Sequence, residues 1–207
     1  MNNTASLGLL TTILLVGLLL IGATAASVLV NTPGEETEQD LEKITKEVTN
    51  EITTYIQIKD TVRKYYKIDG EQKIQKIAIL IKPLVSIDID ITALTIKICN
   101  GEQIKILSYS GQTAFIKSYP LFEHQIWEET DHESYSLIAT HDKDESTVKY
   151  NILNDYTDMA YITIKLSEQF AMEKGDTITI TLFPSPGTTR TITFTAPLPI
   201  KSIVTSD

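Results

Sequence analysis

Few of the residue types that usually support catalysis are present in this sequence of 207 residues. Its single cysteine, Cys99, excludes an internal disulfide and a cysteine-based zinc centre. The histidines, His124, His132 and His141, are too few and too irregularly spaced for a zinc motif such as HExxH. GxSxG, GxxxxGK and GxGxxG patterns are also missing. We therefore expect a protein that is not an enzyme.

Basic residues are outnumbered, with 18 Lys and Arg against 27 Asp and Glu, for a net charge of -9. Nucleic-acid binding depends largely on Lys and Arg placed against phosphates, usually as a basic stripe. The sequence contains no such stripe, so a nucleic-acid partner is not expected.

Charge of either sign is absent from residues 1–34. As a helix, residues 7–30 would be about 36 Å long, which exceeds the ~30 Å hydrocarbon core of a bilayer. The segment lacks the basic start of a secretory signal peptide. Gly22 and Ala26, like Ala23 and Ser27, are small residues four apart that let helices approach closely.

This apolar segment is therefore expected to pack against other helices as well as to enter a membrane. The residues expected at the packing surface are Leu10, Leu14, Gly17, Leu18, Ile21, Gly22, Ala25 and Leu29.

A second helical pattern begins after Thr32-Pro33, an N-cap followed by a first-turn proline. An apolar stripe at spacings of three, four and seven residues then predicts an amphipathic helix to about Tyr66. The stripe consists of Leu41, Ile44, Val48, Ile52, Tyr55 and Val62. This stripe is expected to pack either on the downstream domain or on the same stripe of other copies of the chain. Residues 1–66 are thus expected to be one long helical domain.

From Asp69-Gly70, a turn signal, the apolar period changes to two. A change of phase near Thr92-Ala93 indicates a bend or bulge. Short strands rich in β-branched residues predict an antiparallel β-sandwich of the immunoglobulin-like kind, or a barrel, over residues 67–207. The expected fold class is α+β. The predicted strands cover residues 77–83, 87–91, 94–98, 103–109, 134–140, 161–166, 177–183 and 190–195.

The best candidate site is a group of acidic residues and histidines that matches no complete catalytic pattern and is typical of a solvated loop. It comprises Asp131, His132, Glu133, His141, Asp142, Asp144 and Glu145. Asp142, Asp144 and Ser146 follow the first three ligand positions of a calcium loop. Thr147 replaces the glycine of an EF-hand, and the terminal glutamate is missing. Asp142 and Asp144 are therefore candidate ligands for Ca²⁺ or another divalent cation, and no other cofactor is expected.

Several short motifs follow one another in an order that resembles the archaellins, the subunits of the archaeal flagellar filament and relatives of type IV pilins. Type IV pilins usually have glutamate at the fifth position of the processed chain, whereas this sequence has Ala5. The chain departs from the archaellin pattern at Pro33 and at Glu35-Glu36-Thr37. The motifs are VLVNTPG at 28–34, the run 77–83, Trp127 with SLI at 136–138 and HDKD at 141–144, KGD at 174–176, and FTAP at 194–197.

The resemblance implies a structural subunit of the archaellum that polymerises through its N-terminal helix into the extracellular motility filament. It also implies that the sequence starts at the processed residue Met1, after a prepilin-type peptidase has removed a leader. The expected partners are copies of the chain, with or without a second archaellin, the membrane before assembly, and the basal machinery. Some archaellins bind a metal in the head. The alternatives are an adhesive type IV pilus subunit and a monomeric, membrane-anchored surface binding domain.

Glycosylation is expected to depart from the family habit. Archaellin heads commonly carry N-linked sugars, but the only Asn-x-Ser/Thr triplet of this sequence is Asn2-Asn3-Thr4. Burying a glycan among packed helices is costly. We therefore expect no N-glycan on the head, and any sugar to be O-linked.

Overall fold

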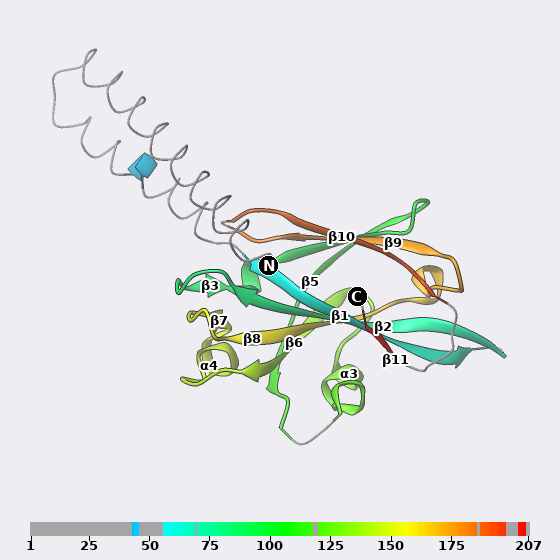
Figure 1. The fold of residues 1–207 in the computed structure, drawn as a ribbon, viewed down its shortest axis with the longest axis horizontal. Helices are drawn as coiled ribbons and strands as arrows, with labels where there is room; N and C mark the ends of the chain where they lie inside the picture. Colours follow the sequence, from blue (N-terminus) through cyan, green and yellow to red (C-terminus); the bar gives the residue numbers. More distant parts are fainter. Residues whose placement is uncertain are drawn as a thin grey trace, which may run out of the picture. The chain divides into compact units, whose positions relative to one another are not determined.

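The computed structural model describes residues 43–45, 56–68, 70–117, 120–185, 187–197 and 203–205 of the chain. The chain divides into two units, residues 1–50 and 51–207. Residues 43–45 are helical, whereas the second unit, called the head domain below, consists mainly of strands (Figure 1). The predicted apolar helix and its eight packing residues, Leu10 to Leu29, lie outside the described residues. Among the described residues, no helix has both the length and the hydropathy needed to cross a bilayer.

Eleven strands are described in the head domain, and short helices connect some of them. The strands are β1 (Ile56–Ile68), β2 (Glu71–Pro83), β3 (Ile89–Asp90), β4 (Thr95–Cys99), β5 (Ile104–Phe115), β6 (Ser134–His141), β7 (Ile152–Leu153), β8 (Met159–Lys165), β9 (Thr177–Phe183), β10 (Arg190–Thr195) and β11 (Ile203–Thr205). The helices are the 3₁₀ turns η1 (Ile91–Ala93), η2 (Leu121–Glu123) and η3 (Glu168–Phe170), and the α-helices α3 (Ile126–Glu129) and α4 (Ser146–Tyr150).

Nine strands form one continuous sheet in the order β10-β9-β4-β5-β6-β8-β2-β1-β11. The long strand β5 belongs to both halves of this sheet: its first residues pair with β4 and its later residues with β6. The register shifts between Tyr109 and Thr113, and Gly111 lies there with a φ of 85°, a conformation that suits glycine. The sheet therefore curls at β5 until its halves face each other as two layers (Figure 1). This continuity replaces the two separate sheets of an immunoglobulin-like sandwich.

One strand pair departs from the predicted antiparallel arrangement, because β5 and β6 run parallel. Parallel neighbours need a crossover connection. Here the connection contains η2 and α3, so these short helices are placed over one face of the sheet.

The predicted helix to Tyr66 is wrong for residues 56–66, which form most of β1. These residues pair with β2 along nearly its whole length, from Ile56 opposite Pro83 to Ile68 opposite Glu71. Ile, Val, Thr and Tyr side chains favour strands, and the pairing with β2 overrides the local helical spacing. The boundary of the head domain consequently lies before Ile56, not at residue 67.

The turn predicted at Asp69-Gly70 is confirmed by the hairpin of β1 and β2 and by the positive φ of Gly70, 90°. Seven predicted strands correspond to β2, β4, β5, β6, β8, β9 and β10. The bounds of β9 and β10 are as predicted, and the other five strands differ from the prediction at one or both ends. The strand predicted at 87–91 is reduced to β3. There the Asp90 carboxylate accepts hydrogen bonds from the N–H and hydroxyl of Thr92, 2.8 and 2.6 Å long, and caps η1. The bend expected near Thr92-Ala93 is this turn.

The main core lies between the two halves of the curled sheet. Alternate residues of β2, β6 and β8 contribute from one half, and alternate residues of β4 and β9 contribute from the other. Tyr135 is fully buried among them, and its hydroxyl lies 2.7 Å from the carbonyl oxygens of both Ile91 and Leu94. This tyrosine joins the start of β6 to the turn before β4.

A smaller cluster covers the opposite face of β1, β2 and β6. Trp127 of α3 stacks on Phe122 with ring centroids 5.5 Å apart, and its Nε1–H donates to the Leu121 carbonyl at 2.8 Å. Both rings pack over Ala78 and Ile138. The centre of the sheet is thereby buried on both faces.

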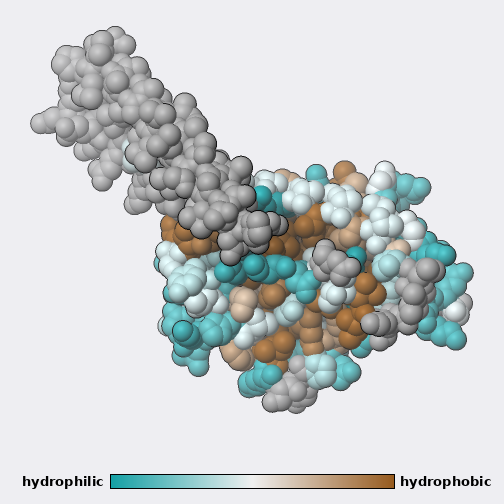
Figure 2. Space-filling model, viewed as in Figure 1, coloured by the Kyte–Doolittle hydropathy of each residue, from teal (hydrophilic) through white to brown (hydrophobic). Residues whose placement is uncertain are grey.

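The two halves do not close completely at the edge where β10 approaches β1. Ile58, Ile192 and Phe194 line an open groove of about 310 Å³ there. Figure 2 shows hydrophobic residues at the surface along this edge, with polar residues on either side.

Candidate functional site

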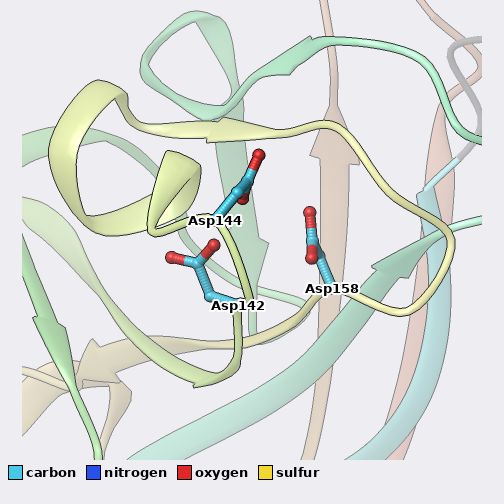
Figure 3. Close-up of side chains that lie close together, drawn as sticks. All are labelled: Asp142, Asp144 and Asp158. Atoms are coloured by element: carbon cyan, nitrogen blue, oxygen red, sulfur yellow. The ribbon is translucent and has the colours of Figure 1, made fainter.

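Three carboxylates meet at one end of the sheet, beyond the last residues of β6 and before the first residues of β8 (Figure 3). Oxygens of Asp142, Asp144 and Asp158 all lie within 4.8 Å of one another. Asp142 and Asp158 are 7% and 1% exposed, whereas Asp144 is exposed. Carboxylates that lie close together and are shielded from water repel one another unless a proton or a cation neutralises their charge.

The antiparallel pairing of β6 with β8 places two of these residues together. Because His141 is opposite Met159, Asp142 follows one strand where Asp158 precedes the other. Asp144 comes from the same connection as Asp142, just before α4. The site is therefore set by a strand register as well as by a loop sequence.

Hydrogen bonds fix Asp144 and Asp158 in place. Asp144 accepts from Asn154 Nδ2 at 2.7 Å and from the Ser146 backbone at 3.1 Å. Asp158 accepts from the backbone N–H groups of Asn154 and Asp155, at 3.1 and 2.9 Å. The donors to Asp144 favour its ionised form.

Asp142 has a different environment. Its Oδ2 accepts a 3.2 Å hydrogen bond from the Val148 N–H, but its buried Oδ1 has no hydrogen-bond partner among the described residues. Burial raises the pKa of the Asp142 carboxyl, and the nearby Asp144 and Asp158 raise it further. The hydrogen bond from Asn154 is the main reason that the pKa of Asp144 is lowered to about 2. Without a cation, these surroundings disfavour the ionised form of Asp142.

The loop around the carboxylates is anchored to the rest of the sheet. Glu145 and Asn151, at the two ends of α4, have φ values of 60° and 59° and so turn the chain tightly. The Asn151 side-chain oxygen accepts from the hydroxyls of Tyr109 and Thr113, at 2.7 and 2.8 Å. α4 and the neighbouring β7 are thus held against β5.

The structure brings the two predicted ligands, Asp142 and Asp144, into one group, but Ser146, at the third position of the calcium-loop pattern, is not part of it. The Ser146 hydroxyl lies 3.0 Å from the Ile152 carbonyl and 3.1 Å from Asn154 Oδ1, so it is engaged by α4's own connection. Asp158 stands with the two predicted residues instead. It was missed because it lies far along the chain, although its position before a strand antiparallel to 134–140 is a usable signal.

The larger predicted group of seven residues does not form one site. Asp131, His132 and Glu133 precede β6, whereas His141, Asp142, Asp144 and Glu145 lie at or beyond its other end. The eight residues of β6 separate these two sets by about 26 Å at ~3.3 Å per residue. Asp131 instead accepts from the Ser134 hydroxyl, 2.6 Å away, and His132 Nδ1 lies 3.3 Å from the Lys165 carbonyl.

The oxygen-only donor set, the orphaned Asp142 Oδ1 and an adjacent hollow of about 320 Å³ fit a hard divalent cation, which prefers carboxylate oxygens and water. They do not fit catalysis by the usual patterns. Among the described residues, no serine, cysteine or histidine stands with these carboxylates in a nucleophile–base arrangement.

The fold of the chain is similar to those of archaeal flagellar proteins. The crystal structure of flagellin FlaB1 from Methanocaldococcus jannaschii matches 72% of this chain and 94% of its own, with a TM-score of 0.63 and 20% identity. The archaeal flagellum of Methanospirillum hungatei strain JF1 matches 92% of this chain and 93% of its own, with a TM-score of 0.53 and 13% identity. At these identities the matches concern the fold.

Sequence comparison then identifies the family. The chain belongs to the archaeal-type flagellin family, whose model matches residues 5–194. It is 28% identical to flagellin B3 of Methanocaldococcus jannaschii over 121 residues, which are 56% of this chain and 52% of the relative. The aligned part thus spans about half the length of that relative.

Proposed function

We propose that this protein is a structural subunit of the archaellum, the extracellular motility filament. The observation that carries the proposal is the extent of the family match, which covers residues 5–194 and so includes both the charge-free segment and the β domain. A filament subunit needs a surface for polymerisation and a stable outer domain, and these two parts of the chain supply them. Catalysis is not required of it.

In this proposal the apolar helix expected from the sequence, residues 7–30, is stored in the membrane before assembly. In the filament, the same apolar surface exchanges lipid for identical helices, which small residues allow to pack closely. A prepilin-type peptidase and the basal machinery act on the chain before and during this exchange. A second archaellin can share the filament, because the packing surface is made of common apolar residues.

Electron microscopy of material sheared from cells tests the proposal. We expect smooth filaments containing this chain, and loss of swimming when its gene is deleted. Filaments that persist without motility loss, together with lost surface attachment, would support the adhesive pilus alternative instead. A chain found only as a monomer in the membrane would favour the anchored binding domain.

Replacement of Leu15 by aspartate tests the role of the apolar segment in particular. A carboxylate at the centre of a membrane-spanning helix costs about 2.5 to 3.5 kcal/mol on insertion scales. Leu15→Asp should abolish filaments, and the fragment 34–207 should remain monomeric. Normal filament yield from either protein would contradict polymerisation through the N-terminal segment.

We also propose that Asp142, Asp144 and Asp158 bind a divalent cation, with Ca²⁺ as the best fit to a site of carboxylates. The ion would offset the repulsion among the three carboxylates and give the orphaned Oδ1 of Asp142 a partner. Its contribution would be structural, by tying the connection before α4 to the start of β8.

Calcium titration of the chain after treatment with a chelator tests this second proposal. We expect added Ca²⁺ to raise the unfolding temperature of the head domain, and Asp142→Asn to remove that response. Asp88→Asn, which changes an exposed carboxylate elsewhere, is the matched control. An equal response of all three proteins to Ca²⁺ would rule out binding at this site.

A further inference from the structure

Three lysines form a row across β1, β2 and β8, on the face of the sheet that carries the smaller cluster around Trp127 and faces away from the main core. Lys64 of β1 is opposite Lys76 of β2, and Lys76 is opposite Lys165 of β8. All three are partly exposed, and none forms an ion pair with another described residue. Like charges placed directly opposite one another destabilise a sheet. This lysine row therefore has a cost in the isolated domain, and an anionic partner would offset it.

Aromatic rings hold two of these ammonium groups in position. Lys76 Nζ lies 5.1 Å from the ring centroids of both Tyr66 and Trp127, and Lys64 Nζ lies 5.5 Å from Tyr66. Burial lowers the pKa of Lys76, as do Lys64 and Lys165, whereas Glu128 raises it. The row is thus a fixed, concentrated positive surface on a protein whose net charge is -9.

The opposite charge collects at residues 142–158, called the acidic end below. This stretch contains five acidic residues and two lysines, and one of those lysines, Lys149, is paired with Glu145 at 2.6 Å. It also carries two strongly exposed aromatic side chains, Tyr150 and Tyr156, which are 68% and 57% exposed. Tyrosine rings accept ammonium groups over their faces and are enriched at protein interfaces.

The two charged surfaces lie at opposite ends of one strand. Asp158 directly precedes β8 and Lys165 is its last residue, so about 23 Å separates them at ~3.3 Å per residue. One domain cannot bring its own lysine row to its own acidic end over that distance, but two copies can. Contacts between different surfaces of identical molecules are head-to-tail, and they generate open helical filaments when they do not close into a ring.

We propose that the lysine row of one head domain binds the acidic end of the next copy in the filament. This inference rests on the proposed polymerisation and adds to it the face through which the outer domains contact each other. Glu145, Asp155 and the two exposed tyrosines would receive the lysines, and the three carboxylates of the candidate cation site would remain with their ion. The contact would fix the orientation of each subunit relative to the next, which apolar contacts between helices determine only weakly by themselves.

Complementary charge reversal in the full chain tests the contact. The variant Lys64→Glu with Lys165→Glu makes both surfaces acidic, and the variant Glu145→Lys with Asp155→Lys makes both basic. Each variant is assembled from detergent at low salt, and its filament yield is measured by sedimentation and electron microscopy. Alone, each variant should give a filament yield about tenfold or more below that of the unaltered chain. An equimolar mixture should restore the yield, because each variant then meets its complement.

Lys174→Glu, in the exposed turn before β9, is the matched control for charge and should assemble as the unaltered chain does. Unfolding temperatures of the variants that are no lower than that of the unaltered chain show that folding is intact. Normal assembly of each reversed variant alone, or a mixture that fails to recover, would overturn the head-to-tail contact while leaving filament formation itself established. Failure of the unaltered chain to polymerise would instead remove the proposed function.

Discussion

The Tyr135 hydroxyl is the only side-chain donor that the described structure brings to the carbonyls of Ile91 and Leu94, each 2.7 Å away. The Ile91 carbonyl also accepts from the Leu94 N–H at 3.2 Å, so the hydroxyl matters most to the Leu94 carbonyl, in the main core where an unsatisfied polar group is costly. Tyr135→Phe should therefore lower the free energy of unfolding by about 1–3 kcal/mol. Chemical denaturation measures the change.

Tyr150→Phe provides the comparison for this prediction. The Tyr150 side chain is 68% exposed, so water replaces whatever its hydroxyl loses. Its stability should match that of the unaltered protein. Equal effects of the two substitutions would mean that the buried hydroxyl contributes nothing particular to the core.

The carboxylates at the acidic end should give the head domain a characteristic acid response. The pKa of Asp144 is about 2 in the folded protein and about 3.9 in an unfolded chain. Its contribution to stability is therefore complete above pH 4 and is lost as the pH falls from about 4 to 2. Asp144→Asn should reduce the fall in unfolding temperature across that range.

Asp142 acts in the opposite direction. Its pKa is raised by burial, so ionising it destabilises the folded state, and that cost disappears in acid. Asp142→Asn should raise the unfolding temperature at neutral pH in the presence of a chelator. Fluorescence of Trp127, the single tryptophan, follows the transition in both variants. For the preceding prediction, a steeper fall in the unfolding temperature of Asp144→Asn than of the unaltered chain between about pH 4 and 2 would show that the hydrogen bonds to Asp144 do not favour its ionised form.

Sequence reasoning found two of the three carboxylates because Asp142 and Asp144 lie close together in the chain. Asp158 escaped because its place depends on the register between β6 and β8, which is a non-local property. The orphaned Oδ1 of Asp142 could not be predicted either, since an unsatisfied atom is defined by everything packed around it.

Among the elements, α3 has an influence out of proportion to its four residues. Trp127 packs with Phe122 over Ala78 of β2 and Ile138 of β6, and its Nε1–H donates a hydrogen bond to the Leu121 carbonyl. Trp127→Ala should cost about 3–5 kcal/mol of stability. Trp127→Phe keeps a ring against Phe122 and should cost less. Circular dichroism during denaturation distinguishes the two outcomes, and similar losses would show that ring burial is not the main contribution.

Strands with one buried face were predictable because isoleucine alternates along them, as in β2 and β4. β1 was not predictable, because its apolar residues continue the helical spacing of the apolar residues before them in the sequence. Only the pairing with β2 decides between helix and strand for this segment. α3 and α4 were missed since neither is long enough to show a period. The parallel pairing of β5 with β6 depends on a crossover that no local pattern encodes.

For the whole molecule, the position of β1 determines which fragments can fold. β1 buries Ile56 and Tyr65 in the main core and Val62 in the outer cluster. The fragment 51–207 should be soluble and should unfold cooperatively, whereas 67–207 should aggregate, because it exposes both the core and the edge of β2. Expression of both fragments and thermal scans check this. A stable 67–207 fragment would show that β1 is dispensable.

The pairing of β11 with β1 has a consequence for how the domain is made. Val62, Arg63 and Lys64 of the first strand lie opposite Thr205, Val204 and Ile203 of the last strand. Tyr65 also donates a 2.6 Å hydrogen bond to the Pro197 carbonyl, just ahead of β11. A ribosome that stops before Ile203 leaves the edge of β1 uncovered and ready to aggregate. Only a chain translated through β11 has this edge of β1 covered. A shorter translation product therefore differs from it in an exposed strand edge before it is assembled into a filament.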